Sequence, residues 1–268
     1  MDVKMSLVIE RNVGNIRVIT LNHQNRNNPF NEDLERSIKL ALADANTDAG
    51  VKAIVITGGH NRSFSAGGDF NEVRQLRGGM EVDRWIDRVT DLYLSVLRVE
   101  KPTVAAIDGY AIGMGFQFSM MFDWRVAAST AEFRMPELRH GIGCSVGAAI
   151  LQHAFGYATM QEIVFACENI SAEKAAHYGI VNQLTHADRL VDEAIARANT
   201  LAEYPQIPYR ATKHTIVSSM EEVLLRSAQS SKEVHRAAFS SRSPHAHFDR
   251  ILGSSNSPDR TSTTSVDA

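Results

Sequence analysis

The chain has 268 residues, 44% of them hydrophobic and 22% charged, with a net charge of −3 at pH 7, which is typical of a globular protein. The slightly acidic balance provides no basic face for nucleic acid or an anionic membrane, so we expect neither as a partner. The only cysteines, Cys144 and Cys167, do not indicate a disulfide framework. The first ten residues do not resemble a signal peptide, and no apolar run is long enough to span a bilayer. We therefore expect a cytoplasmic protein.

Strands and helices alternate in the first half of the chain, as in an α/β fold with mostly parallel strands. The residue patterns predict a hairpin of 7–10 and 16–21, a helix over 31–46, a strand over 51–57, a helix over 85–99, and strands over 103–107 and 124–128. From residue 171 onward the pattern is helical, over 172–178, 187–204, 208–219 and 220–240. The last residues are small and polar and have little to bury, so we expect a disordered tail.

Two glycine-rich turns follow buried strands. The first is Ser65-Ala66-Gly67-Gly68-Asp69, and the second runs from Gly109 to Gly115. Small residues allow a ligand to approach the backbone, and a helix start presents free N–H groups to negative charge. Two such turns at neighbouring strand ends can direct two N–H donors at one oxygen, as an oxyanion hole requires. Either turn alone is also explained by tight packing, and neither matches a dinucleotide-binding or phosphate-binding loop.

These turns, with Lys101 to Ala106 and Met135-Pro136-Glu137, resemble the signature of the crotonase (enoyl-CoA hydratase/isomerase) superfamily over about residues 7–253. The resemblance implies a crotonase-type ββα spiral core with a helical C-terminal region, usually assembled as a trimer. We accordingly expect a spiral core over 1–200, a helical trimerisation region over 201–253, and the tail over 254–268.

The resemblance also implies functions for particular residues. The backbone N–H groups of Gly68 and Met114 would form the oxyanion hole for a CoA thioester, and the turn with Ala66, Gly67 and Asp69 would line the CoA site. From the residues alone, Asp69 is better explained as the N-cap of the helix that follows than as a catalytic acid.

One departure from the family pattern affects the chemistry. Hydratases of this superfamily carry two glutamates, and the corresponding positions here are Gln117 and Glu137. An amide cannot exchange a proton at neutral pH, so addition of water by two carboxylates is disfavoured. One carboxylate, Glu137, beside an oxyanion hole suits enolate chemistry and thioester hydrolysis better, with Gln117 left to position a substrate group.

A closer resemblance is to a branch of the superfamily from carbapenem antibiotic pathways, carried by 28–30, 62–73, 85–89, 109–117, 135–138, 140–147, 234–235 and 237–239. Its members condense malonyl-CoA with pyrroline-5-carboxylate and then hydrolyse the product thioester. The resemblance implies that malonyl-CoA loses carbon dioxide to leave an enolate, which attacks the imine, and that Glu137 then activates water. It implies CoA as substrate and product, with no tightly bound cofactor. Another crotonase reaction on an acyl-CoA, or a catalytically silent acyl-CoA-binding protein, are the competing hypotheses.

Two further residues have both a structural and a functional interpretation. A lone histidine in a helix, such as His235, is more often structural, and Trp85 at helical spacing is more often part of a core. The resemblance instead places His235 at the carboxylate of the imino acid and Trp85 in the wall of its pocket. Cys144 lacks a histidine partner at a recognisable spacing, so we interpret it as a packed residue. The ten histidines form no metal-ligand pattern, and we expect no metal.

Overall fold

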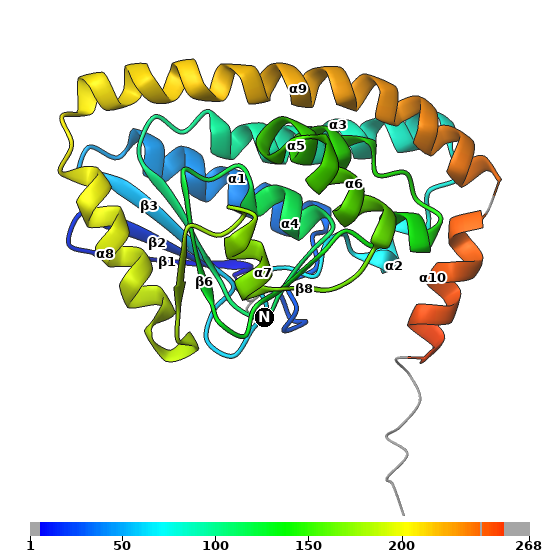
Figure 1. Cartoon of the computed structure of the whole chain (residues 1–268), viewed down its shortest axis with the longest axis horizontal. Helices are drawn as coiled ribbons and strands as arrows, with labels where there is room; N and C mark the ends of the chain where they lie inside the picture. Colours follow the sequence, from blue (N-terminus) through cyan, green and yellow to red (C-terminus); the bar gives the residue numbers. More distant parts are fainter. Residues whose placement is uncertain (1–5, 242, 255–268) are drawn as a thin grey trace, which may run out of the picture.

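The computed structural model describes residues 6–241 and 243–254 and has a six-stranded main sheet covered by helices (Figure 1). The sheet order is β1-β2-β3-β4-β6-β9. The hairpin of β1 and β2 is antiparallel, as predicted, and the other neighbouring strands are parallel. The strands are β1 (Val8–Val13), β2 (Ile16–Leu21), β3 (Ala53–Thr57), β4 (Thr103–Ile107), β6 (Trp124–Ala128) and β9 (Gln183–Thr185). The predicted α/β class is confirmed.

A second, three-stranded sheet contains the strands that follow β4 and β6 in the chain. Its order is β5-β7-β8, with β5 (Tyr110–Ile112), β7 (Glu132–Arg134) and β8 (Ile170–Ser171). Strand β5 begins three residues after β4 ends, so the chain passes from one sheet to the other at Asp108-Gly109. This passage is short, and the glycine-rich second turn therefore lies at the junction of the two sheets.

Helices cover both faces of the main sheet. The apolar side of α8 (Leu190–Ala202) packs on inward-facing residues of β2, β3, β4 and β6. The larger core lies on the opposite face, under α1 (Glu32–Thr47) and α3 (Gly79–Leu97). The remaining helices are α2 (Phe70–Val73), α4 (Met114–Ser119), α5 (Ser145–Phe155), α6 (Tyr157–Ala166), α7 (Ala172–His177), α9 (Gln206–Ser240) and α10 (Ser243–Ser254), with 3-10 turns η1 (Glu137–His140) and η2 (Ala187–Arg189).

Helix α9 corrects one sequence prediction. The two helices predicted over 208–219 and 220–240 are a single helix of 35 residues, which lies along α3 and α5 (Figure 1). After Pro208 in its first turn, the helix contains no glycine or proline, so nothing in the backbone ends it at Ser219. Ser218 and Ser219, next to the predicted division, are on its exposed side.

Helix α10 follows α9 and was not predicted as a separate element. Its Phe248 is fully buried and packs against Phe70 of α2 and Phe239 of α9, with ring centroids 4.9 and 6.4 Å apart. This contact brings the end of the described chain onto α2, next to the first glycine-rich turn. The predicted tail over 254–268 lies outside the described residues, apart from Ser254.

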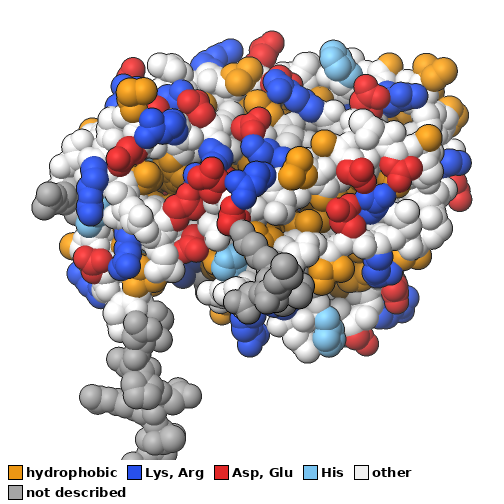
Figure 2. Space-filling model, turned by 180° about the vertical axis from the view of Figure 1, so that it is seen from behind, with side chains coloured by type: hydrophobic (Ala, Val, Ile, Leu, Met, Phe, Trp, Pro, Cys, Tyr) orange, Lys and Arg blue, Asp and Glu red, His pale blue; other side chains and the backbone are white. Residues whose placement is uncertain are grey.

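The described surface has mixed charge on the face in Figure 2, where Lys and Arg side chains alternate with Asp and Glu. Within residues 6–241 and 243–254, no helix combines the length and the apolar run needed to cross a membrane.

Candidate active site

The two glycine-rich turns lie side by side because their backbones are hydrogen-bonded. The Ser65 N–H donates to the Tyr110 carbonyl over 2.9 Å, and the Ile112 N–H donates to the Ser65 carbonyl over 3.0 Å. Ser65 therefore pairs with β5 as an added parallel strand residue. Gly115 allows this approach, because a Cβ at that position would lie 2.4 Å from the Ser65 carbonyl oxygen. The pairing brings Gly68 and Met114 to one cavity, although they are far apart in sequence.

The backbone N–H groups of Gly68 and Met114 are both available to a ligand. Met114 is the first residue of α4, where a helix N–H has no partner within the helix. Phe30 forms hydrogen bonds with the two residues that flank Gly68. Its N–H donates to the Gly67 carbonyl, and its carbonyl accepts from the Asp69 N–H, so Gly68 itself is left out of the pairing. Among the described residues, neither the Gly68 nor the Met114 N–H donates a hydrogen bond to protein. Two free donors at one cavity can stabilise a negatively charged oxygen.

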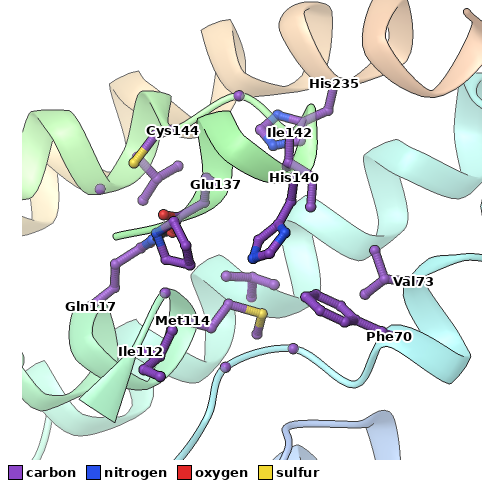
Figure 3. A pocket seen from close by; sticks show the side chains of 18 of the residues that line it. Phe70, Val73, Ile112, Met114, Gln117, Glu137, His140, Ile142, Cys144 and His235 are labelled. Atoms are coloured by element: carbon purple, nitrogen blue, oxygen red, sulfur yellow. Dashed lines mark hydrogen bonds between the residues drawn. The ribbon is translucent and has the colours of Figure 1, made fainter. Parts of the chain in front are cut away.

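The cavity has a volume of about 270 Å³ and is mostly apolar (Figure 3). It contains eight of the nine residues singled out from the sequence. These lining residues are Ala66, Gly67, Gly68, Trp85, Met114, Gln117, Glu137 and His235. The ninth, Asp69, is outside the lining: its carboxylate accepts from the Asn71 N–H over 2.8 Å, which confirms the predicted N-cap of α2.

Glu137 and Gln117 point toward one another inside the cavity (Figure 3). The Gln117 amide donates from Nε2 to Glu137 Oε1 over 2.8 Å, while Oε2 is buried and has no well-formed hydrogen bond with a described residue. Burial raises the pKa of Glu137 to about 7, an effect partly offset by hydrogen bonds from its own backbone N–H, the Cys144 thiol and the Gln117 amide, in that order. A carboxylate with this pKa is well suited to accept a proton from water near neutral pH.

His235 and Trp85 form one wall of the cavity, with ring centroids 5.5 Å apart in an edge-to-face arrangement. The histidine ring is buried, and Nδ1 lies 2.7 Å from the Ser231 carbonyl oxygen one turn earlier in α9. An approach this short requires the Nδ1 proton to lie between the two atoms. Burial lowers the pKa of His235, an effect that the backbones of Ser231 and Gly143 partly offset, and the Ser231 contact places the proton of the neutral ring on Nδ1. Donation from Nε2 to an anion therefore requires a second proton, which a nearby carboxylate favours.

Two lining or neighbouring residues, Tyr93 and His140, were missed as functional candidates. Tyr93 of α3 is fully buried and donates its hydroxyl proton to Gln117 Oε1 over 3.1 Å. It falls on the face of the predicted 85–99 helix that carries Trp85, and that spacing was the available signal. His140 projects into the cavity next to Phe70, with its Nδ1 buried and unpaired among the described residues (Figure 3). Burial, with His247 and Arg134 nearby, lowers the pKa of His140 to about 4.

Cys144 also lines the cavity, but its chemistry is that of a packed residue. Burial and the nearby Glu137 carboxylate raise the pKa of the Cys144 thiol well above its usual range, so it carries its proton at neutral pH. A protonated thiol is a poor nucleophile. In the described parts of the chain, no three His, Cys, Asp or Glu side chains are grouped to hold a metal ion.

Comparisons with known proteins agree with this fold. The chain belongs to the enoyl-CoA hydratase/isomerase family, whose model matches residues 11–250. It is 52% identical to the carboxymethylproline synthase of Pectobacterium carotovorum subsp. carotovorum over 247 residues, which cover 92% of this chain and 99% of that protein.

Solved structures show the same architecture. ThnE from S. clavuligerus is 31% identical, with a TM-score of 0.73, and the match covers 85% of this chain and 100% of that one. An enoyl-CoA hydratase/isomerase from Mycobacterium paratuberculosis is 26% identical, with a TM-score of 0.82 and coverage of 92% and 98%. The crotonase-type fold expected from the sequence is thus confirmed.

Proposed function

We propose that this chain is a carboxymethylproline synthase, which condenses malonyl-CoA with pyrroline-5-carboxylate and then hydrolyses the product thioester. The observation that carries the proposal is a cavity with two free backbone N–H donors and one carboxylate, Glu137, bonded to an amide where a hydratase has a second acid. The 52% identity to a carboxymethylproline synthase supports the same reaction.

The first step needs the two backbone donors and no base. With the thioester oxygen at the N–H groups of Gly68 and Met114, the bond to the malonyl carboxylate breaks and carbon dioxide leaves. The electron pair stays on the substrate as a thioester enolate, whose negative oxygen the two donors stabilise. Loss of one such donor typically costs about 3 kcal/mol of transition-state stabilisation.

The second and third steps use the apolar wall and the carboxylate. The enolate carbon attacks the imine carbon of pyrroline-5-carboxylate, and the imine nitrogen receives the electron pair and keeps or gains a proton. Trp85 and His235 would hold the imino acid. Glu137 then takes a proton from water as that water attacks the thioester carbonyl, the same two donors stabilise the tetrahedral oxyanion, and CoA leaves as its thiol.

Hydration of an enoyl-CoA fits the cavity less well. The short-chain-enoyl-CoA hydratase of Clostridium acetobutylicum is a relative, but only 27% identical. Two-carboxylate hydration needs a second acid beside Glu137, and Gln117 fills that place with an amide that does not titrate. We also propose that the protein acts without a tightly bound cofactor, as a homotrimer in the cytoplasm, as the family resemblance implies.

The purified protein should convert malonyl-CoA and pyrroline-5-carboxylate into carboxymethylproline, detected as the free acid by mass spectrometry. Glu137→Ala should still consume malonyl-CoA but accumulate the CoA thioester adduct, because only hydrolysis needs the base. Crotonyl-CoA serves as the control substrate. Absence of carboxymethylproline, together with rapid hydration of crotonyl-CoA, would show that the protein is a hydratase instead.

A further inference from the structure

A chain of three side chains leads from the core to the catalytic cavity. The Tyr93 hydroxyl lies 3.1 Å from Gln117 Oε1 and 3.4 Å from the Met114 carbonyl oxygen. Gln117 Nε2 in turn lies 2.8 Å from Glu137 Oε1. A tyrosine hydroxyl has one proton to donate, and the shorter contact is to the amide. The two ends of the Gln117 amide are therefore bonded in sequence, its oxygen to Tyr93 and its nitrogen to Glu137.

We propose that Tyr93 is a positioning residue that orients the Gln117 amide so that its N–H side always faces Glu137. A glutamine amide has an accepting end and a donating end of nearly equal size, and rotation by half a turn exchanges them. The wrong orientation would place the amide oxygen against the Glu137 carboxylate. The buried hydroxyl of Tyr93 favours the correct one, because its proton has a shorter contact with the Gln117 oxygen, at 3.1 Å, than with the Met114 carbonyl oxygen, at 3.4 Å. The catalytic consequence rests on the function proposed above.

No other described group competes for this role. Gln117 is enclosed, since a Cβ on Gly147 would lie 3.0 Å from its Nε2. The other neighbour of Nε2 is the Met135 sulfur at 3.8 Å, a weak acceptor that does not distinguish the two orientations strongly. Among the described residues, the Tyr93 hydroxyl is the one side-chain donor to Oε1.

Among the titratable groups in and next to the hydrogen-bonded series Tyr93–Gln117–Glu137, Glu137 is the one that titrates near neutral pH. Burial raises the pKa of Tyr93 well above its usual range, with the negative charges of Glu137 and Glu35 adding to the effect, so the phenol keeps its proton. The Cys144 thiol, from the start of α5, also stays protonated because burial raises its pKa. Burial lowers the pKa values of His140, in η1, and of His235, in α9, so both rings are neutral. The positive charge that reaches this region comes from Arg134 of β7, beside His140.

The direction of the effect follows from the hydrogen bond. Donation from Gln117 favours the charged carboxylate and so lowers the pKa of Glu137 against the effect of burial. If the Gln117 amide is free to turn, its hydrogen bond to the Glu137 carboxylate is lost for part of the time, and the pKa of Glu137 rises. Hydrolysis, which needs the ionised carboxylate, then starts at higher pH. Decarboxylation, which needs no base, should keep its pH dependence.

The test measures the titration of Glu137 directly in the ligand-free protein, by infrared difference spectra of the carboxyl group with Glu137→Gln as the reference. Tyr93→Phe should raise the pKa of Glu137 by about 0.7 pH unit, a fivefold change in proton affinity that corresponds to one neutral hydrogen bond. Gln117→Ala should raise it at least as much. The double variant should match Gln117→Ala alone, because Tyr93 acts through Gln117. Thr90→Val is the matched control: it removes another buried hydroxyl of α3, whose one partner among the described residues is the Ile86 carbonyl of its own helix, and should cause no shift.

An unchanged pKa in Tyr93→Phe, or additive shifts in the double variant, would overturn the proposal. If Tyr93→Phe folds poorly, a fluorinated tyrosine at position 93 gives a test of opposite sign. Its more acidic hydroxyl donates more strongly, so the pKa of Glu137 should fall, and a rise or no change would contradict the orientation mechanism. Because no substrate is present, these results are independent of the assay for carboxymethylproline, and failure of the proposed function would be seen separately.

Discussion

At the scale of one residue, the buried carboxylate of Glu137 lowers the free energy of unfolding of the protein when it is ionised. Burial raises its pKa from an ordinary 4.5 to about 7 in the folded protein. Its neutral form therefore contributes stability that is fully present below pH 4.5 and is lost as the pH rises through 7. A shift of this size corresponds to a cost of up to about 3 kcal/mol above pH 8, since one pKa unit is about 1.4 kcal/mol.

Glu137→Gln should therefore be more stable than the parent protein at pH 8 by about 2 kcal/mol, and equally stable near pH 4.5, while losing thioester hydrolysis. Denaturant unfolding at the two pH values measures the difference. A stability gain of the same size at both pH values would show that packing, and not ionisation, is responsible.

The Nδ1 contact of His235 makes the predicted binding of the imino-acid carboxylate dependent on pH. Because the Nδ1 proton is held by Ser231, the ring must be protonated to donate from Nε2, and KM for pyrroline-5-carboxylate should increase with pH. His235→Ala should raise this KM by one to two orders of magnitude, roughly, and remove its pH dependence, since a charge-assisted bond contributes about 2 kcal/mol. Steady-state kinetics between pH 6 and 9 measure both effects. A parallel loss of decarboxylation and of thermal stability would mean that His235 is structural.

At this scale the sequence could show which residues form the cavity but not how they are bonded. Gln117 and Glu137 were identified by their places in the family pattern, and Trp85 and His235 by the resemblance alone; the cavity brings all four together. The proton arrangement on His235 and the bond from Tyr93 depend on side-chain directions set by packing. No motif spacing reports those directions.

Among the elements, the paired turns carry the clearest mutational consequence. Gly115→Ala would place a Cβ 2.4 Å from the Ser65 carbonyl oxygen, and backbone cannot be pushed aside cheaply. The start of α4 should move away from the first turn and separate the N–H groups of Gly68 and Met114. Malonyl-CoA decarboxylation should then fall by at least about a hundredfold, as when an oxyanion donor is removed.

Decarboxylation is measured from release of carbon dioxide, with circular dichroism confirming the fold. Gly253→Ala is the matched control, because its Cβ would meet no atom within 4 Å and its residue lies in the α10 helix. Near-normal decarboxylation by a folded Gly115→Ala protein would show that the separation of the two turns does not control this step.

The elements themselves were predictable to different degrees. Strands β4 and β6 have the bounds expected from sequence, because short β-branched and small-residue runs between turns are distinctive. Helix α5 was missed because it begins shortly after Gly141 and Gly143 and is apolar over much of its surface, where it packs on α9 and α6. Helix α10 was missed because a single aromatic residue, Phe248, supplies its fully buried contact.

In the molecule as a whole, resemblance identified the fold more completely than periodicity did. Alternating strands and helices indicated parallel pairing, but the passage of the chain into a second sheet at Asp108-Gly109 is not visible in any residue pattern. It depends on contacts between segments that are distant in sequence, such as Ser65 with Ala111. The cavity lies where those distant segments meet, which is why its geometry required the structure.

Helix α9 spans the molecule and is held at both ends. Near its start, Lys213 donates to Asp123 Oδ2 over 2.7 Å, and near its end Arg236 donates to Asp83 over 2.6 Å, beside His235. The 22 residue steps from Lys213 to His235 form a rod of about 33 Å in which each step adds about 100° of rotation. One residue inserted between these anchors would turn His235 away from the cavity while Lys213 stayed in place. Point substitutions on the outer face of α9 leave the direction of His235 unchanged. If His235 holds the imino acid as proposed, the number of residues in the helix therefore helps to determine which substrate the cavity accepts.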